Sequence, residues 1–108
     1  MKTDNNSLFV VTSSINLSVE DTETVFAVVG IADNKERAKE MLKEEVEQFF
    51  TSYNERFVSE DPEDFYGAYE PLSIDNKNHF PNNEWYNMQN SDLGVFCEVK
   101  IEERKLNA

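Results

Sequence analysis

The stretch from Asn34 to Phe57 constrains the fold more than any other part of the chain. Its apolar residues recur every three or four positions, which is the period of one helix face. These residues are Ala38, Leu42, Val46, Phe49, Tyr53 and Phe57. Asp33 and Asn34 are both suitable N-caps, and Asp33 has the capping-box spacing to Glu36. The stretch therefore predicts one long amphipathic helix, which must bury its apolar face against other elements.

Alternation of apolar and polar residues before this helix predicts a first strand over residues 8–19. The strand is long, and we expect a bend or bulge near Ser13 and Ser14. A polar turn follows at residues 20–23. A turn of this length favours antiparallel pairing with the next strand.

The second strand, predicted over residues 24–32, is apolar on both faces. A strand with one solvent face normally alternates, so the uninterrupted run from Val25 to Val29 predicts a central strand covered on both sides. Gly30 is expected to let the chain leave the sheet toward the helix.

Two further strands are predicted after the helix, over residues 84–89 and 93–101. In the later strand the odd-numbered positions are apolar and the even-numbered ones polar, except Phe96. Between helix and strands, residues 58–83 form a long loop rich in acidic and aromatic residues. A short second helix is expected to start there, at Asp61 and Pro62.

This order of elements predicts an α+β fold in a single domain over residues 1–108. The expected architecture is a mostly antiparallel four-stranded sheet in the order β-β-α-β-β, with the long helix on one face. Residues 1–6 are polar and are expected to be disordered.

The charge and the cysteine content of the chain limit its possible functions. The chain has 22 acidic and 10 basic residues, a net charge of −12. Nucleic acid and anionic membranes bind mainly Lys and Arg, so the expected partner is a basic protein surface, unless the charge serves solubility alone. One cysteine excludes an internal disulfide, and the first residues lack the apolar core of a signal peptide. These features predict a cytoplasmic protein.

Residues that carry catalysis are sparse. His79 and Cys97 are the only histidine and cysteine, and they fall on different predicted elements. They indicate neither a zinc site nor a nucleophile paired with its base. We expect His79 to face solvent from the loop and Cys97 to be a packed thiol. The sequence therefore predicts no enzyme, cofactor or metal site.

Acidic and aromatic residues coincide on the late helix and the loop. Between Glu44 and Asp75 ten acids stand against one base, and ten of the thirteen aromatic residues lie between Phe49 and Tyr86. Aromatic residues on irregular backbone are typical of protein interfaces, although packing of the loop explains them equally well. The candidate partner-binding residues are Glu60, Asp61, Glu63, Asp64, Phe65, Tyr66, Tyr69, Glu70, Trp85 and Tyr86.

Three functions fit this pattern. The favoured one is a small non-catalytic protein-binding module, an inhibitor or adaptor that presents residues 60–86 to a basic protein. A second is a nucleic-acid mimic from a phage or mobile element, which would antagonise a DNA- or RNA-binding or defence protein. A third is a small-ligand pocket beneath the loop, lined by Phe65, Tyr69, Trp85 and Tyr86. A homodimer also stays open, because Phe96 is apolar on an otherwise polar strand face.

Overall fold

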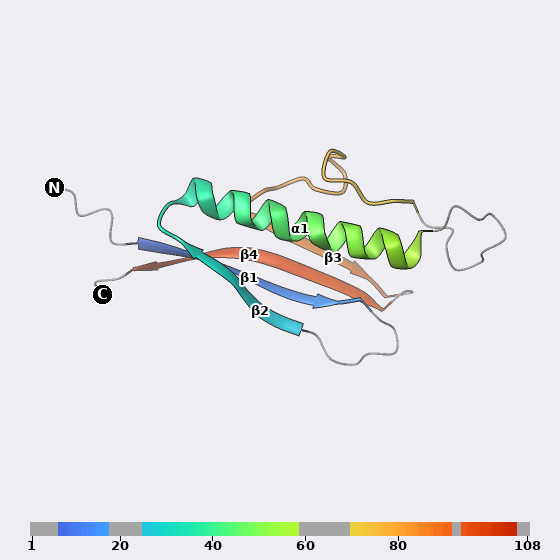
Figure 1. Cartoon of the computed structure of the whole chain (residues 1–108), viewed down its shortest axis with the longest axis horizontal. Helices are drawn as coiled ribbons and strands as arrows, with labels where there is room; N and C mark the ends of the chain where they lie inside the picture. Colours follow the sequence, from blue (N-terminus) through green and yellow to red (C-terminus); the bar gives the residue numbers. More distant parts are fainter. Residues whose placement is uncertain (1–6, 18–24, 59–69, 92–93, 106–108) are drawn as a thin grey trace.

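In the computed structural model, one long helix lies across one face of a four-stranded antiparallel sheet (Figure 1). The structure describes residues 7–17, 25–58, 70–91 and 94–105. The elements are β1 (Ser7–Asn16), β2 (Val25–Ala32), α1 (Lys35–Phe57), β3 (Trp85–Asn90) and β4 (Val95–Lys105). The predicted α+β fold and its order of elements are confirmed. The short helix expected at Asp61 and the disorder expected for residues 1–6 lie outside the described residues.

The helix α1 begins at Lys35 because Asn34 caps it. The Oδ1 of Asn34 accepts a hydrogen bond from the backbone N–H of Arg37 at 2.8 Å. Asn34, and not Asp33, holds the N-cap position, so the capping box expected between Asp33 and Glu36 is not formed. The six apolar residues of the predicted helix face are all buried. The period of the sequence therefore placed both the helix and its buried face.

The covered face of the sheet, which packs against α1, holds the core. Val11 from β1 and Cys97 and Val99 from β4 are fully buried, in one cluster with Leu42 and Val46 of the helix. This arrangement confirms that Cys97 is a packed thiol. The order of the strands, β2-β1-β4-β3, puts β1 and β4 in the centre and explains why their inward residues are the most deeply buried.

The prediction of a central position for β2 is wrong, because β2 lies at an edge of the sheet and pairs with β1 alone. The apolar run from Val25 to Val29 was read as a sign of cover on both sides. In the described structure α1 covers one side only. The side chains of β2 that point away from α1 are exposed.

A bulge in β2 decides which of its side chains point away from the helix. The β1–β2 register shifts between Val11 and Thr12, which leaves Val29 as the extra residue on β2. The bulge predicted near residues 13–14 is therefore misplaced. It lies in the partner strand, and it keeps Val28 and Ile31 on the same face although they are three positions apart.

Gly30 lies inside β2 and does not mark where the chain leaves the sheet. It pairs with Val11 on the covered face. A Cβ atom at Gly30 would overlap the Cε of Met41 from α1. The glycine thus leaves room for the end of the flexible Met41 side chain inside the sheet, which corrects the role expected from the sequence.

Candidate interaction surfaces

The predicted partner-binding residues do not form one surface among the residues that the structure describes. Those from Glu60 to Tyr69 lie outside the described residues. Glu70 is exposed, Trp85 is 49% exposed and Tyr86 is 4% exposed. Neighbouring residues of a strand point to opposite faces, so Trp85 faces away from α1 while Tyr86 faces it.

Tyr86 belongs to the aromatic end of the core. Its ring centroid lies 5.5 Å from that of Phe50, 6.1 Å from that of Phe80 and 6.5 Å from that of Phe49. Burial raises the pKa of its hydroxyl well above the ordinary value. Tyr86 is therefore a packing residue in this structure, and it cannot line one pocket together with Trp85.

The described part of the loop is fastened to the end of α1. The side-chain amide of Asn54 donates to the carbonyl of Leu72 at 2.8 Å, and its Oδ1 accepts from the N–H of Leu72 at 2.7 Å. Further along, Nδ1 of His79 accepts from the N–H of Ser73 at 3.1 Å. His79 is half-buried and closes a turn, rather than simply facing solvent as the sequence led us to expect.

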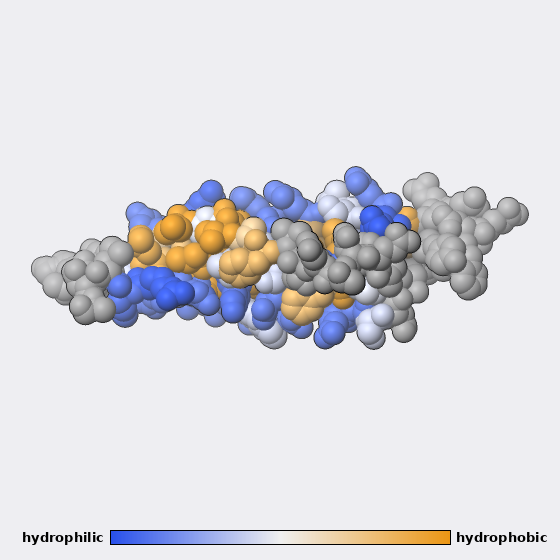
Figure 2. All heavy atoms as spheres, turned by 90° about the horizontal axis from the view of Figure 1, so that it is seen from below, coloured by the Kyte–Doolittle hydropathy of each residue, from blue (hydrophilic) through white to orange (hydrophobic). Residues whose placement is uncertain are grey.

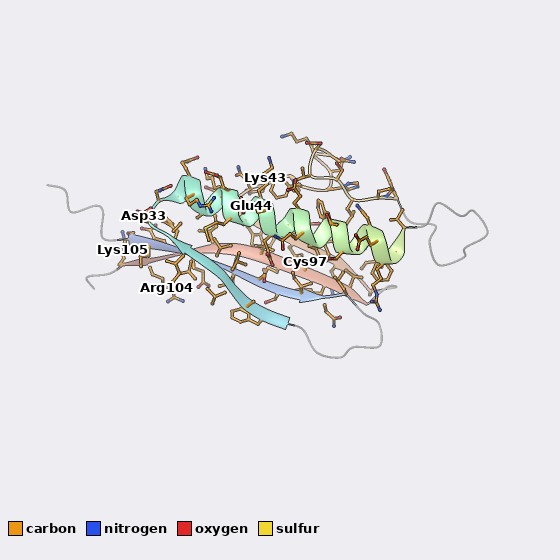
Figure 3. The ribbon with its side chains drawn as sticks, viewed as in Figure 1. Asp33, Lys43, Glu44, Cys97, Arg104 and Lys105 are labelled. Carbon is orange, nitrogen blue, oxygen red and sulfur yellow. The ribbon has the colours of Figure 1, made fainter. Side chains whose placement is uncertain are left out.

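Charge is distributed unevenly along α1. Residues 35–43 hold four bases and two acids, whereas residues 44–57 hold four acids and one base. The change falls between Lys43 and Glu44 (Figure 3). A helix dipole favours acids near the start and bases near the end. The stability of the helix therefore does not explain this order.

The acids at the start of α1 are neutralised by bases. The described ion pairs are Arg37–Glu40 at 3.5 Å, Lys39–Glu36 at 3.6 Å, Lys35–Glu84 at 2.8 Å, Lys39–Glu84 at 3.6 Å and Arg37–Glu44 at 3.8 Å. The hydrogen bond between Lys35 and Glu84 is the main cause that raises the pKa of the lysine and lowers that of the carboxyl. Nucleic-acid mimicry needs rows of carboxylates without bases between them. The described acids at this end of the helix do not supply such a row.

The open face of the sheet, which points away from α1, exposes large apolar side chains. Phe26 is 64%, Val28 58% and Ile31 60% exposed. Leu8 and Val10, half-buried on β1, continue the same surface, since Val10 pairs with Ile31. We call these five residues the apolar patch. Figure 2 looks onto this face and shows apolar side chains gathered over it.

The rest of the open face carries no net charge among its described residues. Its described charged residues alternate along β4 and are Glu98, Lys100, Glu102 and Arg104. Trp85 from β3 donates its indole N–H to Glu98 at 3.0 Å. Phe96 also lies on this face, half-buried on a central strand, so it does not mark an edge of the sheet.

Two small concavities lie on the described surface. One of about 170 Å³ is lined by Phe9, Lys35, Glu84, Ile101 and Glu103. Another of about 250 Å³ is lined by Lys77, Phe80, Pro81, Asn82 and Asn83. Ligand pockets usually measure about 300–1,000 Å³. Neither concavity lies beneath rings of both Trp85 and Tyr86, as the pocket hypothesis required.

Groups that could perform chemistry are not gathered in the described residues. Within the ranges given above, no three His, Cys, Asp or Glu side chains come together as a metal site. Burial raises the pKa of the Cys97 thiol to about 12, which keeps it protonated and weakly nucleophilic near neutral pH.

Comparison with protein-family models, curated proteins and solved structures finds no match for this chain. In the described part of the chain, no helix is both long and apolar enough to cross a membrane.

The sequence missed the residues that stand out most in the structure. Phe26, Val28 and Ile31 were assigned to a covered strand, and none was a candidate for partner binding. The available signal was the absence of any charge from Val25 to Ala32, combined with the uncertainty of where that strand lies in the sheet. An uncharged strand is ordinary in the centre of a sheet and unusual at its edge.

Proposed function

We propose that this chain is a small, non-catalytic protein-binding module of the cytoplasm, an inhibitor or adaptor that docks its acidic end onto a basic protein surface. The acidic end consists of residues 44–57 of α1, Glu70 and Asp75. The observation that carries the proposal is the reversal of charge along α1, from four bases and two acids to four acids and one base.

Acidic residues outside the described ranges add to the negative charge of the chain. Residues 18–24, 59–69 and 92–93 hold eight acids and no base. The described residues on either side of these segments are Leu17 and Val25, Val58 and Glu70, and Ser91 and Gly94. In Figure 1 the ends of β1, α1 and β3 and the start of β4 lie toward the same end of the molecule, while the start of β2 lies nearer the middle. Opposite charge speeds encounter with a basic partner and makes the association sensitive to salt.

The test is a capture experiment followed by charge reversal. The tagged full-length chain is used to capture proteins at low salt, and those released by moderate salt are identified and purified. The affinity of each for the chain is then measured with Glu47→Lys plus Glu55→Lys. The matched control is Glu36→Lys plus Glu40→Lys, which makes the same change of charge at the start of α1.

We expect the late-helix pair to slow association and raise Kd several-fold, while the early-helix pair has little effect. Reversal of Asp61, Glu63 and Asp64 is expected to act in the same direction as the late-helix pair. Equal effects of the two helix pairs, or binding that salt does not weaken, would contradict the proposal.

A further inference from the structure

The apolar patch on the open face calls for an occupant other than water. Three of its side chains, Phe26, Val28 and Ile31, are each more than half exposed, and they belong to one strand. β2 is an edge strand of eight residues with no charge and no proline. Edge strands normally carry such residues, because they discourage association. Exposed apolar patches rimmed by polar groups mark interaction sites.

The sequence pattern of β2 points to cover on both sides. A run that is apolar on both faces is typical of strands buried on both faces. In the single chain, α1 covers the face of β2 that holds Gly30, and Val28 and Ile31 on the other face are left exposed. The pattern and the structure agree if a second layer lies against the open face.

The charges of the open face select the kind of occupant. Two acids and two bases alternate on β4, so this face is neutral although the whole chain carries −12. A strongly basic partner, which suits the acidic end, gains nothing here. The order Glu98, Lys100, Glu102, Arg104 is complementary to its own reverse. A copy turned end to end about Ile101 would bring Glu98 near Arg104 of the second copy and Lys100 near Glu102. These contacts would add to the ion pairs that Glu102 makes within its own chain with Lys100 at 3.6 Å and Arg104 at 3.0 Å.

Charge along the molecule favours the same arrangement. Arg104 and Lys105 lie at the end of β4 that is near the start of α1, at the opposite end from the acidic end (Figure 3). Two copies with the same orientation would place their acidic ends together. Reversed copies separate those ends and place each nearer the bases of the other copy.

The size of the open face is adequate for a stable pair. β1 and β4 have 10 and 11 residues. With about 3.3 Å per residue and about 4.8 Å between strands, a four-stranded face covers roughly 500–600 Å² in projection, and its side chains make the accessible area larger. A standard interface buries about 800 Å² on each partner.

We propose that two copies of this chain pack open face to open face, with their strands running in opposite directions and α1 on the outside of each. Sheets packed in this way keep their strand directions within about 30° of each other. The interface is separate from the acidic end, so the dimer would present two acidic ends at opposite extremities. The proposal therefore goes beyond the binding function and does not depend on it.

The test is sedimentation equilibrium of the full-length chain over a wide dilution series. We expect the mass to approach twice 12.5 kDa at high concentration and to fall toward 12.5 kDa on dilution. Val28→Glu puts a charge in the centre of the patch and should leave only the monomer. Ala27→Glu is the matched control: Ala27 is also exposed on β2 but lies on the opposite face, since it pairs with the buried Ser13.

A second variant keeps the test informative if Val28→Glu fails to fold. Phe26→Thr keeps a strand-forming residue and should raise the dimer Kd about tenfold or more. Circular dichroism confirms that each variant retains its fold. A wild-type chain that is monomeric at every concentration overturns the proposal. So does a dimer that Val28→Glu leaves intact, and so does equal disruption by Ala27→Glu, which would indicate pairing through the edge of β2.

Discussion

The two faces of the sheet carry similar apolar residues but differ in how far these residues are exposed. On the covered face, Val11, Cys97 and Val99 are fully buried by α1. On the open face, Phe26, Val28 and Ile31 are as apolar but stay more than half exposed. Hydrophobicity alone therefore does not mark the core of this protein. What separates the faces is whether another element of the same chain covers them, and the predictions below test that difference.

The largest effect is expected on the covered face. Leu42 is fully buried in the middle of α1, and Leu42→Ala should lower the free energy of unfolding by about 2–5 kcal/mol, because it removes buried methyl groups and leaves a cavity. Urea unfolding followed by circular dichroism measures this change. The control is Lys43→Ala at the next, exposed position, which should change stability by less than about 0.5 kcal/mol.

The next effect concerns the loop that closes the aromatic end of the covered face. Asn54→Ala removes both hydrogen bonds to Leu72 and should cost about 1–3 kcal/mol in the same urea experiment, since the backbone groups of Leu72 lose a partly buried partner. Asn83→Ala, at an exposed loop position, is the control. Equal stability of the two variants would mean that the loop is not held by Asn54.

Alkaline pH should weaken the covered face selectively. Burial raises the pKa of Cys97 from 9.0 to about 12 and raises that of Tyr86 as well. Because both pKa values are higher in the folded chain than in the unfolded chain, the contribution of these two groups to the free energy of unfolding is fully present below about pH 9. Above it the unfolded chain releases protons that the folded chain retains. Stability should fall by about 1.4 kcal/mol per pH unit for each group that has ionised in the unfolded chain.

Cys97→Ala separates this linkage from general alkaline damage. The variant removes one titrating group, so its stability should fall less steeply than that of the wild type between pH 9 and 12. The comparison is of slopes, measured by urea unfolding at each pH. An unchanged slope would show that Cys97 is not held protonated by burial.

The smallest change of monomer stability is expected on the open face. Phe26→Thr should alter the free energy of unfolding by less than about 0.5 kcal/mol when measured at a concentration where the chain is monomeric. A loss comparable to that of Leu42→Ala would erase the distinction between the faces, because it would mean that Phe26 already belongs to the core of the single chain.

The sequence was sufficient for features that depend on local periodicity. The helix and its buried face follow from the spacing of Leu42, Val46 and Phe49. The antiparallel pairing of β1 with β2 was also predicted correctly, whereas the turn predicted at residues 20–23 lies outside the described residues. The order of the strands was not readable, because it is set by long-range pairing of β1 with β4, which no local pattern records. β2 and the bulge were predicted at the wrong places because the order of the strands could not be predicted.

The candidate surface was less predictable than the fold. Trp85 and Tyr86 are adjacent and were assigned to one partner-binding group, yet the pleat of β3 separates them to opposite faces. Their directions depend on the register with β4, in which Tyr86 pairs with the buried Val99. An apolar pattern in the sequence also does not show whether the residues are buried by their own chain or by a second chain. The residues of the open face pose this question.

The fluorescence of Trp85 tests the role of the open face most directly. It is the only tryptophan, it lies on that face and it is 49% exposed. If two copies pack open face to open face, dilution should shift its emission to longer wavelength and increase quenching by acrylamide, in parallel with the fall in mass. Val28→Glu should show the exposed signal at all concentrations. A mass that halves while the emission of Trp85 stays constant would contradict the account.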